Sequence, residues 1–321
     1  MSGPVNSDAL ATREVSILLP AHDNVCVPLV RDLQEQAARL PGLCYEIVVA
    51  DDGSTDMESI QANRAINLLP HCRFIERKPN AGRAAIRNFL AREARYARLL
   101  FIDSDLHVCS PTFLERYVQS CGEVVVGGIR MGGDAHRLRH NLRYRYEKAS
   151  EGQHDHRHRS QHPDRDFSAA CFLISKAVIG QCPFDEHFRH YGYEDALLGK
   201  SLSAHGHPIA HIDNPILMDD YEDNLTYVGK TEEACRTLHQ FRLLLGDHSK
   251  LVRWQERLSR HRMMYPMLER AARLLCPGIR RQLVTGRPSV PLFNAYKLLY
   301  YIRLCSESNS MPVHIDTPSA T

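Results

Sequence analysis

Short apolar segments and amphipathic helices alternate through the first half of the chain. Apolar runs at 14–19, 46–50, 73–76 and 99–102 predict buried strands, and the pattern over 84–97 predicts a helix. Strands that alternate with helices of this length indicate an α/β fold, with a mostly parallel sheet and helices on both faces. Ligands of such sheets bind beyond the carboxyl ends of the strands. The residues that follow each strand are therefore the first candidates for a functional site.

Acidic residues follow two of the predicted strands. Asp103, Ser104 and Asp105 come directly after the 99–102 strand, and two carboxylates this close can converge on one divalent cation. Such an ion bridges the two phosphates of a nucleotide-sugar. The 51–56 segment, DDGSTD, ends another strand, and a carboxylate there can accept hydrogen bonds from a nucleobase or ribose. Both segments also fit turns that cap the next helix, so both interpretations stay open.

Three further groups of residues have side chains suited to a catalytic site. Arg83 and Arg87 lie in the first turns of a predicted helix, where the N-terminus favours anions and Arg87 can hold a phosphate. Glu194 and Asp195 begin another predicted helix, either as capping residues or with a carboxylate acting as general base on an attacking hydroxyl. His211 ends the last predicted strand, 207–212, as a hydrogen-bonded structural residue or as a metal ligand.

The charge of the chain is unevenly distributed. The 40 Lys and Arg residues nearly balance the 38 Asp and Glu residues, so the net charge of +2 gives no case for nucleic-acid binding. The 236–303 stretch, however, contains 14 basic and 3 acidic residues. It fits either solvated helix faces or attraction to something anionic, such as a membrane or a phosphorylated acceptor. Within it, the 291–305 segment predicts a helix that packs on the first domain or lies on anionic lipid.

The remaining composition predicts a cytoplasmic protein. No apolar run reaches the roughly 20 residues that span a bilayer, and the N-terminal segment lacks the apolar core of a secretory signal. The ten cysteines are scattered, which suits free thiols in a reducing compartment. Because of the basic stretch, peripheral attachment to the inner membrane face is a second expectation. The His-rich 151–164 segment predicts a mobile loop. This loop is either a solvated loop, a flexible lid or a metal-binding tract.

Seven segments occur in a characteristic order. They are VSILLP, IVVADDGSTD, NAGRAAIRN, LLFIDSDLHV, FSAACFLISK, FDEHFRHYGYEDALLGKSL and HPIAHIDNP. Together they resemble the family 2 glycosyltransferases of GT-A fold over residues 13–230, in particular bacterial members that build polysaccharides, and more distantly the transferase modules of chondroitin polymerases. The agreement of several weak signals makes this resemblance specific. It implies a catalytic domain at 13–230, a basic helical extension at 231–305, and disordered termini at 1–12 and 306–321.

The resemblance also implies a role for each candidate residue. Asp52, with Asp51 beside it, contacts the uracil or equivalent base, and Asp103 contacts the ribose. Asp105 binds Mn²⁺ or Mg²⁺, with His211 as a further ligand. Asp195 is the catalytic base, and Glu194 lies near it on the acceptor side. The residues expected to bind the nucleotide-sugar are Pro20, Asp51, Asp52, Arg83, Arg87, Asp103 and Ser104.

The implied reaction is a metal-dependent transfer of a hexose or N-acetylhexosamine from a nucleoside-diphosphate sugar, here a UDP-sugar, with inversion at the anomeric carbon. The acceptor is a saccharide or a lipid-linked glycan. Two other functions remain open at this point. A nucleotidyltransferase that makes nucleotide-sugars shares the architecture but needs a Gly-rich basic segment near the first strand, which residues 20–23 do not provide. A non-catalytic relative that binds nucleotide or carbohydrate would keep the fold alone.

Overall fold

The computed structural model describes residues 13–285 and 287–309. These form two compact units, one of residues 13–139 and 146–221 and the other of residues 140–145, 222–285 and 287–309. The boundary expected at 230/231 falls inside α9 (Asn224–Gln240). Residues 1–12 and 310–321, which include most of the predicted disordered termini, lie outside the described residues, whereas 306–309 end the last helix.

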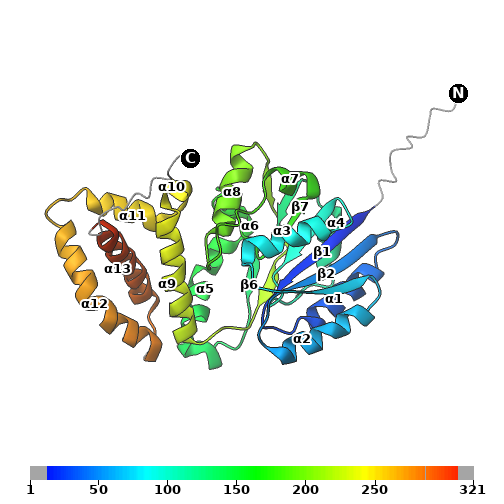
Figure 1. Cartoon of the computed structure of the whole chain (residues 1–321), viewed down its shortest axis with the longest axis horizontal. Helices are drawn as coiled ribbons and strands as arrows, with labels where there is room; N and C mark the ends of the chain where they lie inside the picture. The colour runs from blue at the N-terminus through cyan, green and yellow to red at the C-terminus, as the bar shows by residue number, and fades with distance from the viewer. Residues whose placement is uncertain (1–12, 286, 310–321) are drawn as a thin grey trace, which may run out of the picture. The chain divides into compact units, whose positions relative to one another are not determined.

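The first unit contains a mixed sheet of seven strands in which parallel pairing dominates (Figure 1). Its strands are β1 (Glu14–Ala21), β2 (Cys44–Asp52), β3 (Cys72–Arg77), β4 (Arg98–Ile102), β5 (Val124–Val126), β7 (Cys171–Ser175) and β8 (Ile209–His211). They lie in the order β3-β2-β1-β4-β7-β5-β8. Four of the six pairings are parallel, and only β7 runs antiparallel to its neighbours β4 and β5. The predicted α/β class with a mostly parallel sheet is confirmed.

Helices cover both faces of this sheet because side chains alternate along each strand. In β1, Ile17 and Leu19 pack in one core with α1 and α4, whereas Leu18 packs in the other with α3, α7 and α8. The helix predicted at 84–97 ends earlier, since Ala94 has an extended backbone. The helices of the sheet region are α1 (Val27–Ala38), α2 (Met57–Asn63), η1 (Arg64–Leu68), α3 (Arg83–Glu93), α4 (Phe113–Gln119), α7 (Lys176–Gln181) and α8 (Glu194–Ala204).

From the sequence, the apolar 123–129 segment (EVVVGGI) predicts a single strand. This prediction is wrong, because two strands, β5 and β6 (Ile129–Met131), share the segment. β5 belongs to the main sheet, whereas β6 pairs with β9 (Ile216–Met218) in a separate ribbon. The break falls at Gly128, whose φ of +89° suits glycine. A Cβ atom at this position would lie 2.6 Å from the guanidinium of Arg159. The close approach of a buried arginine therefore ends β5.

The loop predicted at 151–164 is also wrong, because short helices occupy its first half. The 134–166 region contains η2 (Arg137–His140), α5 (Leu142–Ser150), η3 (Glu151–His154) and α6 (His156–Arg159). Arg159 is 5% exposed and donates hydrogen bonds to four backbone carbonyls and to one imidazole nitrogen. Its acceptors belong to His154, Val126, Gly127, Ile212 and His211. This one side chain fastens the segment to the ends of β5 and β8.

The second unit is helical. It contains α9 (Asn224–Gln240), α10 (Arg242–Leu245), η4 (Gly246–His248), α11 (Lys250–Ser259), α12 (Tyr265–Thr285) and α13 (Val290–Asn309). In α13, Phe293, Tyr296 and Tyr301 are buried, and the Tyr296 hydroxyl donates to Glu232 of α9 at 2.6 Å. The helix predicted at 291–305 is therefore confirmed. It was expected to pack on the first domain, whereas the partners found here are α9, α11 and α12 of its own unit. No helix in the described parts of the chain is both long and apolar enough to cross a bilayer.

Candidate functional site

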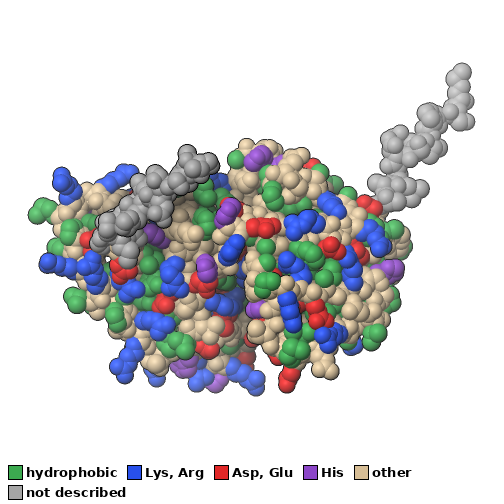
Figure 2. All heavy atoms as spheres, viewed as in Figure 1, with side chains coloured by type: hydrophobic (Ala, Val, Ile, Leu, Met, Phe, Trp, Pro, Cys, Tyr) green, Lys and Arg blue, Asp and Glu red, His purple; other side chains and the backbone are tan. Residues whose placement is uncertain are grey.

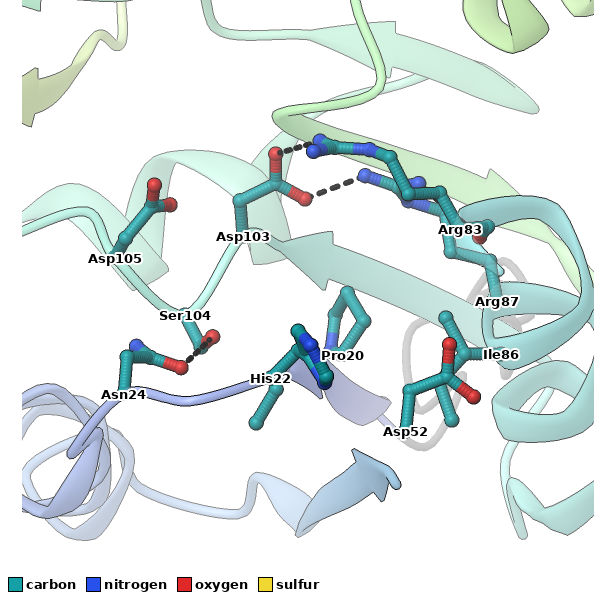
Figure 3. A pocket seen from close by; sticks show the side chains of 11 residues that line it. Pro20, His22, Asn24, Asp52, Arg83, Ile86, Arg87, Asp103, Ser104 and Asp105 are labelled. Atoms are coloured by element: carbon teal, nitrogen blue, oxygen red, sulfur yellow. Dashed lines mark hydrogen bonds and ion pairs between the residues drawn. The ribbon is translucent and has the colours of Figure 1, made fainter. Parts of the chain in front are cut away.

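A pocket of about 220 Å³ lies at the carboxyl edge of the parallel strands in the first unit. The sheet register places Ala21, which ends β1, opposite Asp51 near the end of β2, and β4 runs beside β1. The segments that leave these strands form the pocket wall together with the first turns of α3 (Figure 3). The lining residues are Pro20, Ala21, His22, Asn24, Asp52, Arg83, Ile86, Arg87, Asp103, Ser104 and Asp105. Seven of the eleven predicted site residues therefore share one pocket.

Two arginines of α3 hold Asp103 between them. Arg87 donates from Nη2 to Oδ1 of Asp103 at 2.5 Å, and Arg83 donates from Nη2 to Oδ2 at 3.1 Å. Figure 3 shows both guanidinium groups pointing at this carboxylate. The Arg87 side chain is only 2% exposed, whereas the Arg83 side chain is 45% exposed. Arg87 is thus an internal partner of Asp103, and Arg83 keeps contact with solvent.

Glu194 connects the start of α8 to the same two arginines. Its Oε1 accepts a hydrogen bond from Nε of Arg83 at 3.1 Å and lies 3.5 Å from Nη1 of Arg87. The next residue, Asp195, is partly buried. Burial, and then the negative charge of Glu194, raise the pKa of Asp195 to about 6. A carboxylate with this pKa can accept a proton near neutral pH, although neither acid lines the pocket directly.

Asp52 joins the end of β2 to the start of α3. Its Oδ1 accepts from the backbone N–H of Ala81 at 3.1 Å, and its Oδ2 accepts from that of Gly82 at 2.9 Å. The guanidinium of Arg77 lies 3.4 Å from Oδ1. The carboxylate therefore orders the segment before α3 and also faces the pocket.

The neighbouring Asp51 is turned away from the pocket lining. Its carboxylate accepts hydrogen bonds from the backbone N–H and the hydroxyl of Ser54. Asp56 then caps α2 by accepting from two backbone N–H groups of that helix, as the capping interpretation predicts. Between them, Gly53 has a φ of +71°, and a Cβ there would lie 2.5 Å from the backbone nitrogen of Asn80. The structure thus separates the two adjacent aspartates, since Asp52 lines the pocket and Asp51 orders the turn.

His211 lies outside the pocket lining, at the end of β8. Its Nδ1 is 2.5 Å from Nη1 of Arg159, and its Nε2 is 3.0 Å from the carbonyl oxygen of Pro163. A neutral ring protonated on Nε2 satisfies both contacts, and burial together with Arg159 lowers the pKa of His211, which favours that neutral form. Both ring nitrogens are therefore engaged by the protein, as in the structural interpretation of this residue.

Sequence reasoning missed four pocket residues, Ala21, His22, Asn24 and Ile86. His22 and Asn24 follow the carboxyl end of β1, so the same positional rule that selected the acidic segments would have found them. Asn24 accepts from the hydroxyl of Ser104 at 3.0 Å and so connects the loops after β1 and β4. Ile86 lies one turn after Arg83 and directly before Arg87 on α3, and its apolar side chain carried no signal of a polar site.

The pocket offers few protein ligands to a metal ion. Over residues 13–285 and 287–309, no three His, Cys, Asp or Glu side chains are grouped as a ready metal site. Asp103 and Asp105 both line the pocket. Mg²⁺ in particular keeps several waters and binds through one or two carboxylates plus substrate phosphates, and Mn²⁺ also suits carboxylate, carbonyl and water oxygens. The oxygen donors present therefore fit a divalent ion that arrives with a diphosphate.

An acidic and arginine-lined pocket at the carboxyl edge of a mostly parallel sheet is typical of α/β proteins that bind nucleotides. The family model described as "Glycosyl transferase family 2" matches residues 16–182. The chain belongs to glycosyl transferase family 2. No curated protein sequence matches the chain significantly.

A solved mannosyltransferase structure shares the fold at low sequence identity. The mannosyltransferase PcManGT from Pyrobaculum calidifontis, in complex with GDP-Man and Mn²⁺, has a TM-score of 0.52 and 13% identity, over 92% of this chain and 86% of that chain. Residues 1–349 of S. aureus TarS give a TM-score of 0.49 and 14% identity, over 92% of both chains.

Proposed function

We propose that this protein transfers a hexose or N-acetylhexosamine from a UDP-sugar to a saccharide or lipid-linked glycan, with inversion at the anomeric carbon. The observation that carries the proposal is the joining of Asp103, Arg83, Arg87 and Glu194 in one charged network beside the pocket. Such a network holds anionic and cationic groups together where a nucleoside diphosphate would bind. Membership of glycosyl transferase family 2 supports the same reaction class.

In this proposal the pocket binds the nucleotide part of the donor. Asp52 accepts hydrogen bonds from the base, and Asp103, held in place by buried Arg87, accepts from the ribose. The resemblance implies that Arg87 approaches the diphosphate, but Arg83 has the more exposed guanidinium of the two and takes this role in the proposal. Asp105 would hold a Mn²⁺ or Mg²⁺ ion, and His211 would join it only if its present hydrogen bonds were released. Such an ion, when bound, would supply positive charge against the departing diphosphate.

Asp195 is the proposed general base. Its carboxylate accepts the proton of the acceptor hydroxyl while the hydroxyl oxygen attacks the anomeric carbon. The bond from that carbon to the diphosphate oxygen breaks, and its electron pair leaves with the nucleoside diphosphate. Attack from the face opposite the leaving group inverts the configuration. Burial, and then the negative charge of Glu194, keep the pKa of Asp195 high enough for proton transfer near neutral pH.

The test compares three variants with the wild-type protein. Asp105→Asn is expected to abolish transfer and to remove the Mn²⁺ dependence of UDP binding measured by calorimetry. Asp195→Asn is expected to depress kcat while UDP binding survives, because a base acts only in the chemical step. Asp32→Asn, an exposed aspartate on α1, is the matched control and should change neither property.

Two results would contradict the proposal. Full activity of Asp105→Asn would show that the metal ion bound by Asp105 takes no part in the reaction. Loss of UDP binding in Asp195→Asn would show that Asp195 has a structural role rather than a catalytic one. The class of reaction is tested separately with the wild-type protein. Pyrophosphate release from a nucleoside triphosphate, with no UDP release from UDP-sugars, would instead indicate a nucleotidyltransferase.

A further inference from the structure

Large apolar side chains are exposed in one part of the helical unit. Of the twelve large hydrophobic residues that are exposed among the described residues, eight lie between positions 243 and 275. Met263 is 90% exposed, Leu274 is 79% exposed and Met267 is 70% exposed. Side chains of this size are seldom left in water as a cluster unless they meet another surface.

The geometry of α12 gathers several of these side chains on one face. The buried positions of this helix, Ala272, Cys276 and Leu283, face the rest of the unit. Positions 267, 270, 274 and 281 are three, four or seven residues apart and lie on the opposite face. We call this face, with the turn before it, the α12 surface. It consists of Arg262, Met263, Met264, Met267, Arg270, Leu274, Leu275 and Arg281.

The charge of this region is strongly positive and unbalanced. Residues 250–281 contain nine Lys and Arg residues and only two acidic ones. Arg262, Arg270 and Arg281 are exposed, and within the described residues none of them forms an ion pair. Arg280, in contrast, turns inward and pairs with Glu232 of α9 at 2.8 Å. Figure 2 shows Lys and Arg side chains projecting from this unit, with hydrophobic side chains between them.

We propose that the α12 surface docks on a bilayer containing anionic lipid. Exposed arginines that form no ion pair with any described residue are interleaved here with exposed methionine and leucine. This combination matches the two layers of a membrane interface, since the charges meet lipid phosphates and the apolar groups enter the acyl boundary. Long arginine side chains keep their charge in the headgroup layer while their stems cover apolar surface. A folded protein partner would have to supply many acids around an apolar patch, whereas an anionic bilayer supplies both chemistries. The contact needs no sugar donor, so it stands apart from the proposed reaction.

Vesicle binding by the full chain tests this inference. The only tryptophan of the chain, Trp254 on α11, is 55% exposed and lies in the same unit, so its fluorescence reports docking. We expect binding to vesicles of phosphatidylcholine with phosphatidylglycerol, a blue shift of Trp254 emission, and weaker binding as salt is raised. Vesicles of phosphatidylcholine alone should bind at least tenfold more weakly.

Two pairs of variants separate the apolar and the charged contributions. Met267→Glu with Leu274→Glu should weaken binding at least tenfold, and the control Leu68→Glu, at an 85% exposed site of the first unit, should not. Arg262→Gln with Arg270→Gln should weaken it similarly, whereas Arg31→Gln with Arg95→Gln, also exposed arginines, should not.

Three results would overturn the inference: equal binding to neutral vesicles, equal loss in the control variants, or absence of vesicle binding. Concentration-dependent self-association that Met267→Glu abolishes, without vesicle binding, would assign the surface to a protein interface instead. Circular dichroism of each variant confirms that it is folded.

Discussion

The raised pKa of Asp195 gives a sharp test of its proposed role. Burial and the charge of Glu194 raise this pKa to about 6, from an ordinary value of 3.8. If Asp195 must be ionised to accept a proton, kcat/KM should fall below about pH 6 as the carboxylate becomes protonated. A group with a pKa of 6 is about nine-tenths ionised at pH 7 and about one-tenth ionised at pH 5. We therefore expect about a tenfold loss of kcat/KM between these two values.

Glu194→Gln isolates the contribution of the neighbouring charge. Gln removes the negative charge that opposes ionisation of Asp195, and its carbonyl oxygen can still accept the hydrogen bond from Arg83. The pKa of Asp195 should fall, but it should stay above 3.8 because burial is the larger cause of the shift. If it falls to about 5, the ratio of kcat/KM between pH 7 and pH 5 drops from about ten to about two.

The assay is the pH dependence of kcat/KM for UDP release, measured with a saturating metal concentration. The ratio between the two pH values is informative even if the substitution lowers kcat at every pH. Glu35→Gln, at an exposed ion pair on α1, is the control and should leave the profile unchanged. An acid limb that stays in place or moves upward in Glu194→Gln would refute the electrostatic coupling, and a wild-type profile without a limb near pH 6 would refute Asp195 as the base.

Three further substitutions test how the site is supported, each by urea unfolding. Arg87→Met leaves Asp103 without its buried partner and should lower the free energy of unfolding by about 3–5 kcal/mol. Exposed Arg95→Met should lower it little, and an equal loss in both variants would contradict the burial of the pair. Gly53→Ala should lower the free energy of unfolding by about 1–3 kcal/mol, since the backbone is left-handed there and the backbone of Asn80 lies against it. An unchanged free energy of unfolding would disprove this close approach of Asn80 to Gly53. In Arg159→Lys, the three N–H donors of lysine cannot satisfy the five acceptors of the Arg159 guanidinium, so the free energy of unfolding should fall by about 3 kcal/mol. Amide hydrogen exchange over 154–163 should become faster, and unchanged exchange would show that Arg159 does not hold this segment.

The sequence was informative about the fold because the strands that build the pocket are buried on both faces. β1, β2 and β4 each contain a short apolar run, and polar residues follow each run, so both the elements and the edge of the sheet were predictable. The division at Gly128 was not predictable, because it depends on Arg159, a residue 31 positions away whose burial no local pattern indicates. For the same reason a segment rich in His and Arg was predicted as a loop.

The site was predictable in composition and less so in its contacts. Position after a strand selected Asp52 and Asp103 correctly as pocket residues. The same rule could not distinguish Asp51 from Asp52, because adjacent residues in a strand point to opposite faces and only the register decides which one meets the pocket. The use of both His211 nitrogens also depends on a tertiary contact, with Arg159.

The burial of Arg87 is better explained by the site than by stability. A buried ion pair can often be replaced by apolar side chains of similar volume without loss, since desolvation of the two charges offsets their attraction. The Nε atom of Arg87 is moreover buried without a hydrogen-bond partner in the described part of the chain, which adds a further cost. Because this ion pair adds little to stability, the burial of Arg87 is better explained by its effect on the orientation of the Asp103 carboxylate. A carboxylate that must present one oxygen edge to a ligand needs a rigid partner on the other side, and a guanidinium packed in the core supplies that partner.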